Sequence, residues 1–127
     1  MEGGMALHMK EIQIIMDQNS VIIGSDITGA VTVNYNGRFD GIQVNTYVTG
    51  TSDQVFFTNV DGKTTSLLTR LYMSKDSIGD KKSFRFTARV EKILYKEARI
   101  RFRAAIIQEH KEIVSDTVFM SLNDNLR

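Results

Sequence analysis

The sequence of 127 residues contains no cysteine, no proline and no tryptophan. Without cysteine the chain has neither a disulfide framework nor a thiolate metal ligand, and because it suits a reducing compartment we expect a cytoplasmic location. Without proline, turns and sheet edges must be made by glycine, asparagine and aspartate. No apolar run approaches the ~20 residues of a membrane-spanning helix. The length fits one domain, because domains cluster at about 100–150 residues.

Motifs of catalysis and of metal binding are also missing. No serine lies in a Gly-x-Ser-x-Gly motif, and no glycine loop carries the lysine of a phosphate-binding loop. The two histidines are His8, near the start of the chain, and His110, in an expected turn, so we predict no zinc site. Aspartates are scattered over the expected loops, which makes a calcium site a weaker alternative to ordinary turn chemistry. The sequence thus predicts a protein that is not an enzyme and binds no cofactor.

Alternation of apolar and polar residues predicts an all-β fold. In Ile27–Tyr35 and in Ser83–Val90, apolar side chains recur at every second position. Further strands are expected at residues 11–16, 42–48, 55–60, 98–108 and 113–122. Residues 64–74 fit either a strand or a helix, and their lack of glycine favours a short helix near residues 65–74. About seven to eight strands with turns between them predict a single immunoglobulin-like β-sandwich.

We expect this β-sandwich domain to occupy residues 10–122. Residues 1–9 are expected to be a disordered leader or an addition made for expression, and residues 123–127 a polar, frayed tail. The apolar phases of the clearest strands predict a core between the sheets, formed by Val31, Val33, Phe84, Phe86, Ile100 and Phe102. Gly24 or Gly41 is expected to have a positive φ, because each lies at a predicted turn.

Five segments resemble, in their order and spacing, the signature of the arrestin family. They are Val21–Val33 with glycines at 24 and 29, Gly41–Gly50, Thr65–Tyr72, Gly79 followed by Phe84-Arg85-Phe86, and Ala98–Ile107. The family includes arrestins, α-arrestins, the retromer small subunit and bacterial sporulation-control proteins, and the resemblance is to its amino-terminal domain. It implies an arrestin-like sandwich that acts as a non-enzymatic scaffold or adaptor in trafficking and binds another protein. The family pairs two such sandwiches, of which this sequence holds one.

Basic residues gather between positions 81 and 103. Nine lysines and arginines stand there against two acidic residues, a local charge of +7 in a protein of net charge +1. Because strand side chains alternate, five arginines are expected to point away from the core. They are Arg85 and Arg89 in one expected strand and Arg99, Arg101 and Arg103 in the next. If those strands are neighbours, the five form one anion-binding face, since guanidinium groups suit carboxylates and phosphates.

Two kinds of partner fit such a face: an acidic or phosphorylated segment of a protein, or an anionic lipid surface. The alternative is a solvated face whose arginines are balanced by acids on other strands. No aromatic residue lies among these arginines on the outward-facing side of their strands, and the net charge is small, so we expect no nucleic-acid partner. An edge strand offers another route, by pairing with a partner or with a second copy of the chain. A structural role in a larger assembly is the remaining alternative.

Overall fold

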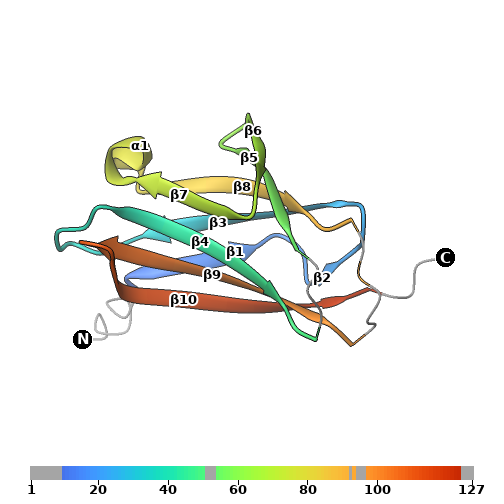
Figure 1. Cartoon of the computed structure of the whole chain (residues 1–127). Helices are drawn as coiled ribbons and strands as arrows, with labels where there is room; N and C mark the ends of the chain where they lie inside the picture. Colours follow the sequence, from blue (N-terminus) through green and yellow to red (C-terminus); the bar gives the residue numbers. More distant parts are fainter. Residues whose placement is uncertain (1–9, 51–53, 92, 94–96, 124–127) are drawn as a thin grey trace, which may run out of the picture.

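In the described part of the chain, ten strands form two sheets that pack face to face, as Figure 1 shows for this computed structural model. The structure describes residues 10–50, 54–91, 93 and 97–123. The expectations for the leader and for most of the tail fall outside these residues. Within them, no helix is long and apolar enough to cross a membrane. The predicted β-sandwich is confirmed, with more strands than the seven or eight expected.

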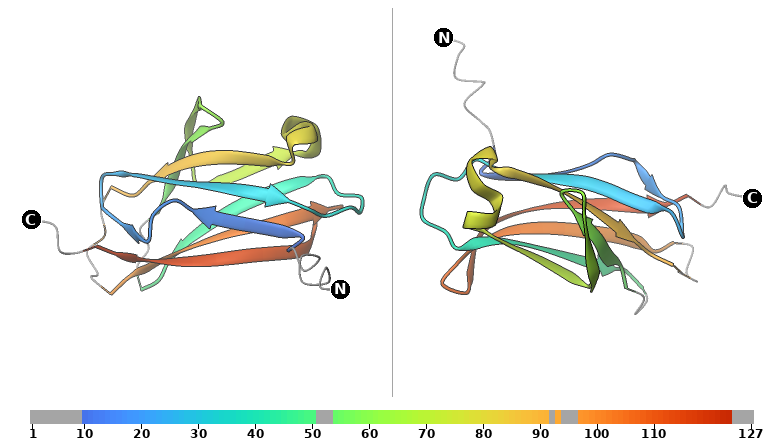
Figure 2. Two further views of the ribbon diagram at one scale, coloured as in Figure 1. Left: turned by 180° about the vertical axis from the view of Figure 1, so that it is seen from behind. Right: turned by 90° about the horizontal axis from the view of Figure 1, so that it is seen from above.

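Each sheet has five strands. The first sheet runs in the order β1 (Ile12–Met16), β3 (Asp26–Val33), β8 (Ser83–Arg89), β5 (Phe56–Val60) and β6 (Lys63–Leu68). The second runs in the order β2 (Ser20–Val21), β10 (Lys111–Leu122), β9 (Arg99–Gln108), β4 (Gly41–Val48) and β7 (Arg70–Ser74). A short helix, α1 (Lys75–Ile78), and a 3-10 turn, η2 (Gly79–Lys81), connect β7 to β8. Figure 2 shows α1 at one end of the sandwich and the β5–β6 hairpin standing out from its body.

The core lies between the sheets and follows the alternation seen in the sequence. In β3 every second residue from Ile27 to Val33 is buried, because that side of the strand faces the second sheet. Phe86 of β8 lies deep in the core, its ring centroid 5.6 Å from that of Phe57 and 5.9 Å from that of Phe102. All six residues predicted as core are buried. The prediction of which side of these strands faces the core is therefore confirmed.

Two glycines in Val21–Val33 meet different physical needs. Gly24 has a φ of 84°, which confirms the expected turn, whereas Gly41 lies within β4 without a positive φ. Gly29 instead faces the core, where an added Cβ would lie 2.9 Å from Cζ of Phe86. Its missing side chain makes room for that ring.

Residues 63–74 form two strands, so the expectation of a helix near residues 65–74 is wrong. Of the three leucines in this stretch only Leu71 is buried, whereas a packed helix would bury them together on one side. β7 is held by pairing with β4, in which Leu71 lies opposite Val44. The short helix begins only after it, with Ser74 as the N-cap that accepts a hydrogen bond from the backbone of α1.

Tight turns join β5 to β6 and β9 to β10. The central residues have positive φ in both: Asp61 (50°) and Gly62 (83°) in one, Glu109 (51°) and His110 (67°) in the other. Such turns match the twist of the two strands that they connect. His110 thus lies in the turn where it was expected. The connection that holds Gly37 is longer, because the strands on either side of it, β3 and β4, belong to different sheets.

Candidate functional site: an aromatic and arginine face on the second sheet

The five arginines predicted as a binding site lie on two opposite faces of the sandwich. β8, in the first sheet, carries Arg85 and Arg89, whereas β9, in the second, carries Arg99, Arg101 and Arg103. The expectation of one common face is therefore wrong. It required β8 and β9 to be neighbours, but the chain crosses from one sheet to the other between them. Because side chains alternate along a strand, the arginines of β8 point outward from the first sheet and those of β9 point outward from the second, on opposite sides of the sandwich.

On the first sheet, both arginines are balanced by acids. The guanidinium of Arg85 pairs with the carboxylate of Asp17, and that of Arg89 lies 3.0 Å from Asp26 and 3.7 Å from Glu91. Solvent-exposed pairs of this kind contribute about 0–1 kcal/mol each to stability. They match the alternative of a solvated face, because the positive charge there is compensated within the chain.

Two acids on this side have lowered pKa values. A hydrogen bond of 2.5 Å from the Thr28 hydroxyl, together with the pairing to Arg85, holds the pKa of Asp17 below its ordinary value. Partial burial alone would raise the pKa of Asp61. A hydrogen bond of 2.9 Å from the Arg85 backbone N–H and the Lys81 ammonium, also at 2.9 Å, outweigh that effect and lower this pKa as well. Both carboxylates are therefore ionised over the whole neutral range.

On the second sheet, the terminal nitrogens of Arg103 also have partners within the chain. Its two terminal nitrogens both donate to the carboxylate of Glu112, and one of them donates to the Ser115 hydroxyl at 3.1 Å. Bidentate pairing of this kind uses the same edge of the guanidinium that would bind an external anion. Arg103 is thus the least available of the three arginines on β9.

Arg99 and Arg101 have aromatic neighbours in place of acids. The guanidinium carbon of Arg99 lies 4.9 Å from the ring centroid of Phe119, and that of Arg101 lies 5.4 Å from that of Tyr47. Neither arginine forms an ion pair with any residue that the structure describes. Cation–π contacts at exposed positions contribute about 0.5–1 kcal/mol each. They hold the guanidinium groups in place and leave their net charge uncompensated.

The strand register places these four side chains together. Arg101 lies directly between Tyr47 of β4 and Phe119 of β10, and Arg99 lies two residues away on the same side of β9. Both rings point to solvent, with Tyr47 52% and Phe119 48% exposed. We call this set of Tyr47, Arg99, Arg101 and Phe119 the aromatic–arginine face.

This face offers two things to a partner. The exposed rings provide apolar area, and each guanidinium carries several N–H donors that can reach a carboxylate or a phosphate. The Nε atom of Arg101 is buried without a hydrogen-bond partner, so its interaction with anions must go through the terminal nitrogens. Aromatic and arginine side chains are also the residue types enriched at the centres of protein interfaces.

The sequence pattern missed the aromatic half of this site. Arginines were compared only with residues on their own strands, so no aromatic residue was expected among them; Tyr47 and Phe119 reach them from the two adjacent strands. One signal was available, because Tyr47 falls in the polar phase of its strand with Gln43 and Asn45. Core packing does not explain a large aromatic side chain at a position of the strand that faces solvent.

Comparisons with known proteins leave the chain without an assigned family. Neither a known protein family nor a curated protein matches the sequence. Among solved structures, the Reelin-N domain of F-spondin aligns with a TM-score of 0.49 at 10% identity, covering 91% of this chain and 88% of that one. The human F-spondin reeler domain aligns with 0.48 at 9% identity, covering 90% and 89%. A conjugative transposon lipoprotein from Bacteroides eggerthii aligns with 0.48 at 12% identity, covering 91% and 100%.

Proposed function

We propose that this β-sandwich is a non-enzymatic interaction domain that binds an acidic segment of a protein partner on its aromatic–arginine face. The observation that carries the proposal is the contrast among the five arginines. Three are paired with acids of the chain, whereas Arg99 and Arg101 are positioned by exposed rings and have no acid partner among the described residues. A partner's carboxylates or phosphates would supply the missing charge.

A short protein segment suits this face better than a membrane or a nucleic acid. Recognition of anionic lipid generally uses clusters of about four to eight basic residues, and nucleic acids need many phosphate contacts. Here two arginines are free of acids, and the net charge of the protein is +1. Two guanidinium groups beside two exposed rings match instead one or two acidic side chains that alternate with apolar ones.

The more specific function, an arrestin-like adaptor in the cytoplasm, extends this proposal. Its support is the glycine spacing in Val21–Val33 and the order of the strand motifs after it. The likeness to solved structures described above does not bear on it. An adaptor would use the aromatic–arginine face as its docking surface and would need no catalytic group.

The test uses two double variants with the same change in charge. Arg99→Gln with Arg101→Gln removes the cations of the face, and Arg85→Gln with Arg89→Gln removes two arginines from the opposite sheet as the control. Fluorescent 12-residue peptides that alternate Glu or phosphoserine with Leu or Phe serve as probes in anisotropy titrations at low and moderate salt. Charged hydrogen bonds contribute ~1.5–3 kcal/mol each, so the face variant should bind at least about tenfold more weakly.

The control variant should bind like the parent chain. Equal losses in both variants would show that binding follows total charge and would contradict the proposal. Binding to vesicles with phosphatidylserine but to no peptide would replace the protein partner with a lipid surface. Thermal unfolding of both variants checks that the fold is intact, because these surface substitutions should change stability little.

A further inference from the structure

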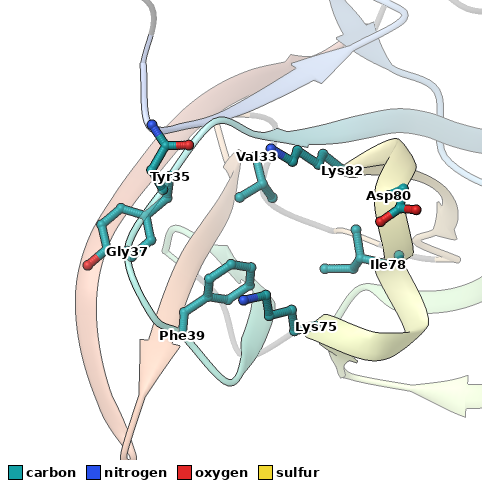
Figure 3. A pocket seen from close by; sticks show the side chains of 10 residues that line it. Val33, Tyr35, Gly37, Phe39, Lys75, Ile78, Asp80 and Lys82 are labelled. Carbon is teal, nitrogen blue, oxygen red and sulfur yellow. The ribbon is translucent and has the colours of Figure 1, made fainter.

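A cavity of about 200 Å³ opens at one end of the sandwich, between the β3–β4 connection and the α1–η2 segment. Figure 3 shows its lining side chains. Its floor is apolar, formed by Val33 (2% exposed), Ile78 (4%) and Phe39 (9%). It lies where β4 begins, whereas Tyr47 of the aromatic–arginine face lies near the end of that strand. The cavity is therefore separate from that face.

One wall of the cavity is built by the β3–β4 connection. The ring of Tyr35 meets that of Phe39 edge to face, with centroids 6.1 Å apart and an angle of 68° between the planes. The Tyr35 hydroxyl folds back over Gly37, where an added Cβ would lie only 2.5 Å from the hydroxyl oxygen. The tyrosine ring is thus packed against its own loop, so this wall is formed without a ligand.

The opposite wall carries the charges. Lys75, Asp80 and Lys82 line it, and Figure 3 shows both lysine side chains reaching from this wall toward the apolar floor. The ammonium of Lys75 lies 5.1 Å from the ring centroid of Phe39. Neither lysine forms an ion pair within the part of the chain that the structure describes. Two ammonium groups and one carboxylate leave this wall with an uncompensated positive charge.

The backbone fixes one of these lysines at the cavity. Lys82 has a φ of 55°, in the left-handed region that side chains other than glycine rarely adopt. Its carbonyl oxygen accepts a hydrogen bond of 2.8 Å from the Val33 N–H, which ties the residue to the end of β3. Such a conformation persists only where the surrounding structure enforces it. The Lys82 backbone is thus held at the edge of the cavity, next to Val33 of its floor.

We propose that this cavity binds a small carboxylate with an apolar body, such as an aryl or branched alkyl acid or the carboxyl-terminal residue of a peptide. The apolar part would lie on the floor, and the carboxylate would contact Lys75 and Lys82. The cavity volume of about 200 Å³ suits a compact acid whose apolar body is about the size of one side chain. Asp80 disfavours a phosphate dianion by like-charge repulsion, so a monoanion fits best.

The test is an NMR titration of the uniformly ¹⁵N-labelled chain. The probes are phenylacetate and N-acetyl-Gly-Gly-Phe as the free acid, with phenylacetamide and the amidated peptide as neutral counterparts. Shifts should be confined to residues 33–39 and 75–82, with a dissociation constant of about 1 mM for the acids. The neutral counterparts should bind about tenfold more weakly, because they lack the negative charge that would interact with the ammonium groups of the two lysines. Tighter binding of the peptide acid than of phenylacetate identifies a peptide terminus as the source of the carboxylate, and the reverse identifies a free acid.

Two double variants with equal change in charge complete the test. Lys75→Gln with Lys82→Gln should weaken binding of both acids about tenfold, whereas Lys63→Gln with Arg70→Gln should leave it unchanged. The Arg99→Gln, Arg101→Gln variant should also bind normally, which separates this site from the proposed protein-binding face. Absence of shifts at tens of millimolar acid, equal shifts with the neutral amides, or unchanged binding in the Lys75, Lys82 variant would each overturn the proposal.

Discussion

Replacing Gly29 by alanine tests how closely Phe86 packs over its cross-strand neighbour on the core side of the first sheet. The added Cβ would lie 2.9 Å from Cζ of Phe86 and 2.8 Å from Sδ of Met16, whereas ordinary van der Waals contact begins near 3.4 Å. Met16 presents the flexible end of its side chain and can turn away. Phe86 is held by two neighbouring core rings, so its ring must move by about half an ångström against them.

The magnitude follows from two opposing effects. Overpacking of a core costs ~1–3 kcal/mol in unfolding free energy. Alanine also restricts the unfolded chain, which stabilises by about 0.4–1 kcal/mol wherever its native φ is permitted. Gly29 lies outside the left-handed region, so this gain applies in full. Subtracting the gain from the cost leaves a destabilisation between about 0 and 2.6 kcal/mol with a centre at about 1.3 kcal/mol, and that central value corresponds to a fall in Tm of about 4–8 °C.

Urea unfolding followed by circular dichroism measures the effect, since the chain has no tryptophan for fluorescence. A double-mutant cycle with Phe86→Leu isolates the cause, because leucine lacks the ring end that the new Cβ meets. In that background Gly29→Ala should cost clearly less than in the parent chain, because the contact with the ring is gone and only the Ile15 carbonyl oxygen, 3.0 Å from the added Cβ, remains as a stiff neighbour. The same cost in both backgrounds would refute the close-packing argument.

Two further predictions concern pH and a turn. Because Asp17 and Asp61 have folded pKa values below their unfolded ones, their contribution to stability is present above about pH 4 and is lost as the pH falls through the folded values. Urea midpoints measured from pH 6 to pH 2 should therefore fall less steeply in Asp17→Asn than in the parent chain, and parallel curves would contradict this. His110→Gly should raise the unfolding free energy by about 0.5–1 kcal/mol, because glycine relieves the positive φ of 67° in the β9–β10 turn. An unchanged or lower urea midpoint would show that the turn is not strained.

Alternation in the sequence was sufficient for the long strands and their buried sides but not for the order of strands in the sheets. A period of two determines which side of a strand faces the core, and that side was predicted correctly for β3, β8 and β9. It carries no information on which strands pair. β8 and β9 follow each other in the sequence, yet they belong to different sheets, and this single fact divided the expected arginine face in two.

The helix expected near residues 65–74 failed for a related reason. Leucines spaced for a helix also fit a strand, and the decision rests on long-range pairing of β7 with β4, which the local pattern does not contain. The candidate site shows the same limit. Arg99 and Arg101 were found from their own strand, but the rings that distinguish them from the other arginines belong to β4 and β10.

The parallel pairing of β2 with β10 has a consequence for how the chain folds. Ser20 lies opposite Ser121, so β2, the second strand of the described chain, pairs with β10, the last one. Contacts between residues so distant in sequence form slowly, because a long loop must close before they contribute any stability. During synthesis, β1 and β3 can pair early, but the second sheet lacks both β9 and β10 until nearly the whole domain has left the ribosome. We therefore expect the sandwich to form late and as one cooperative unit.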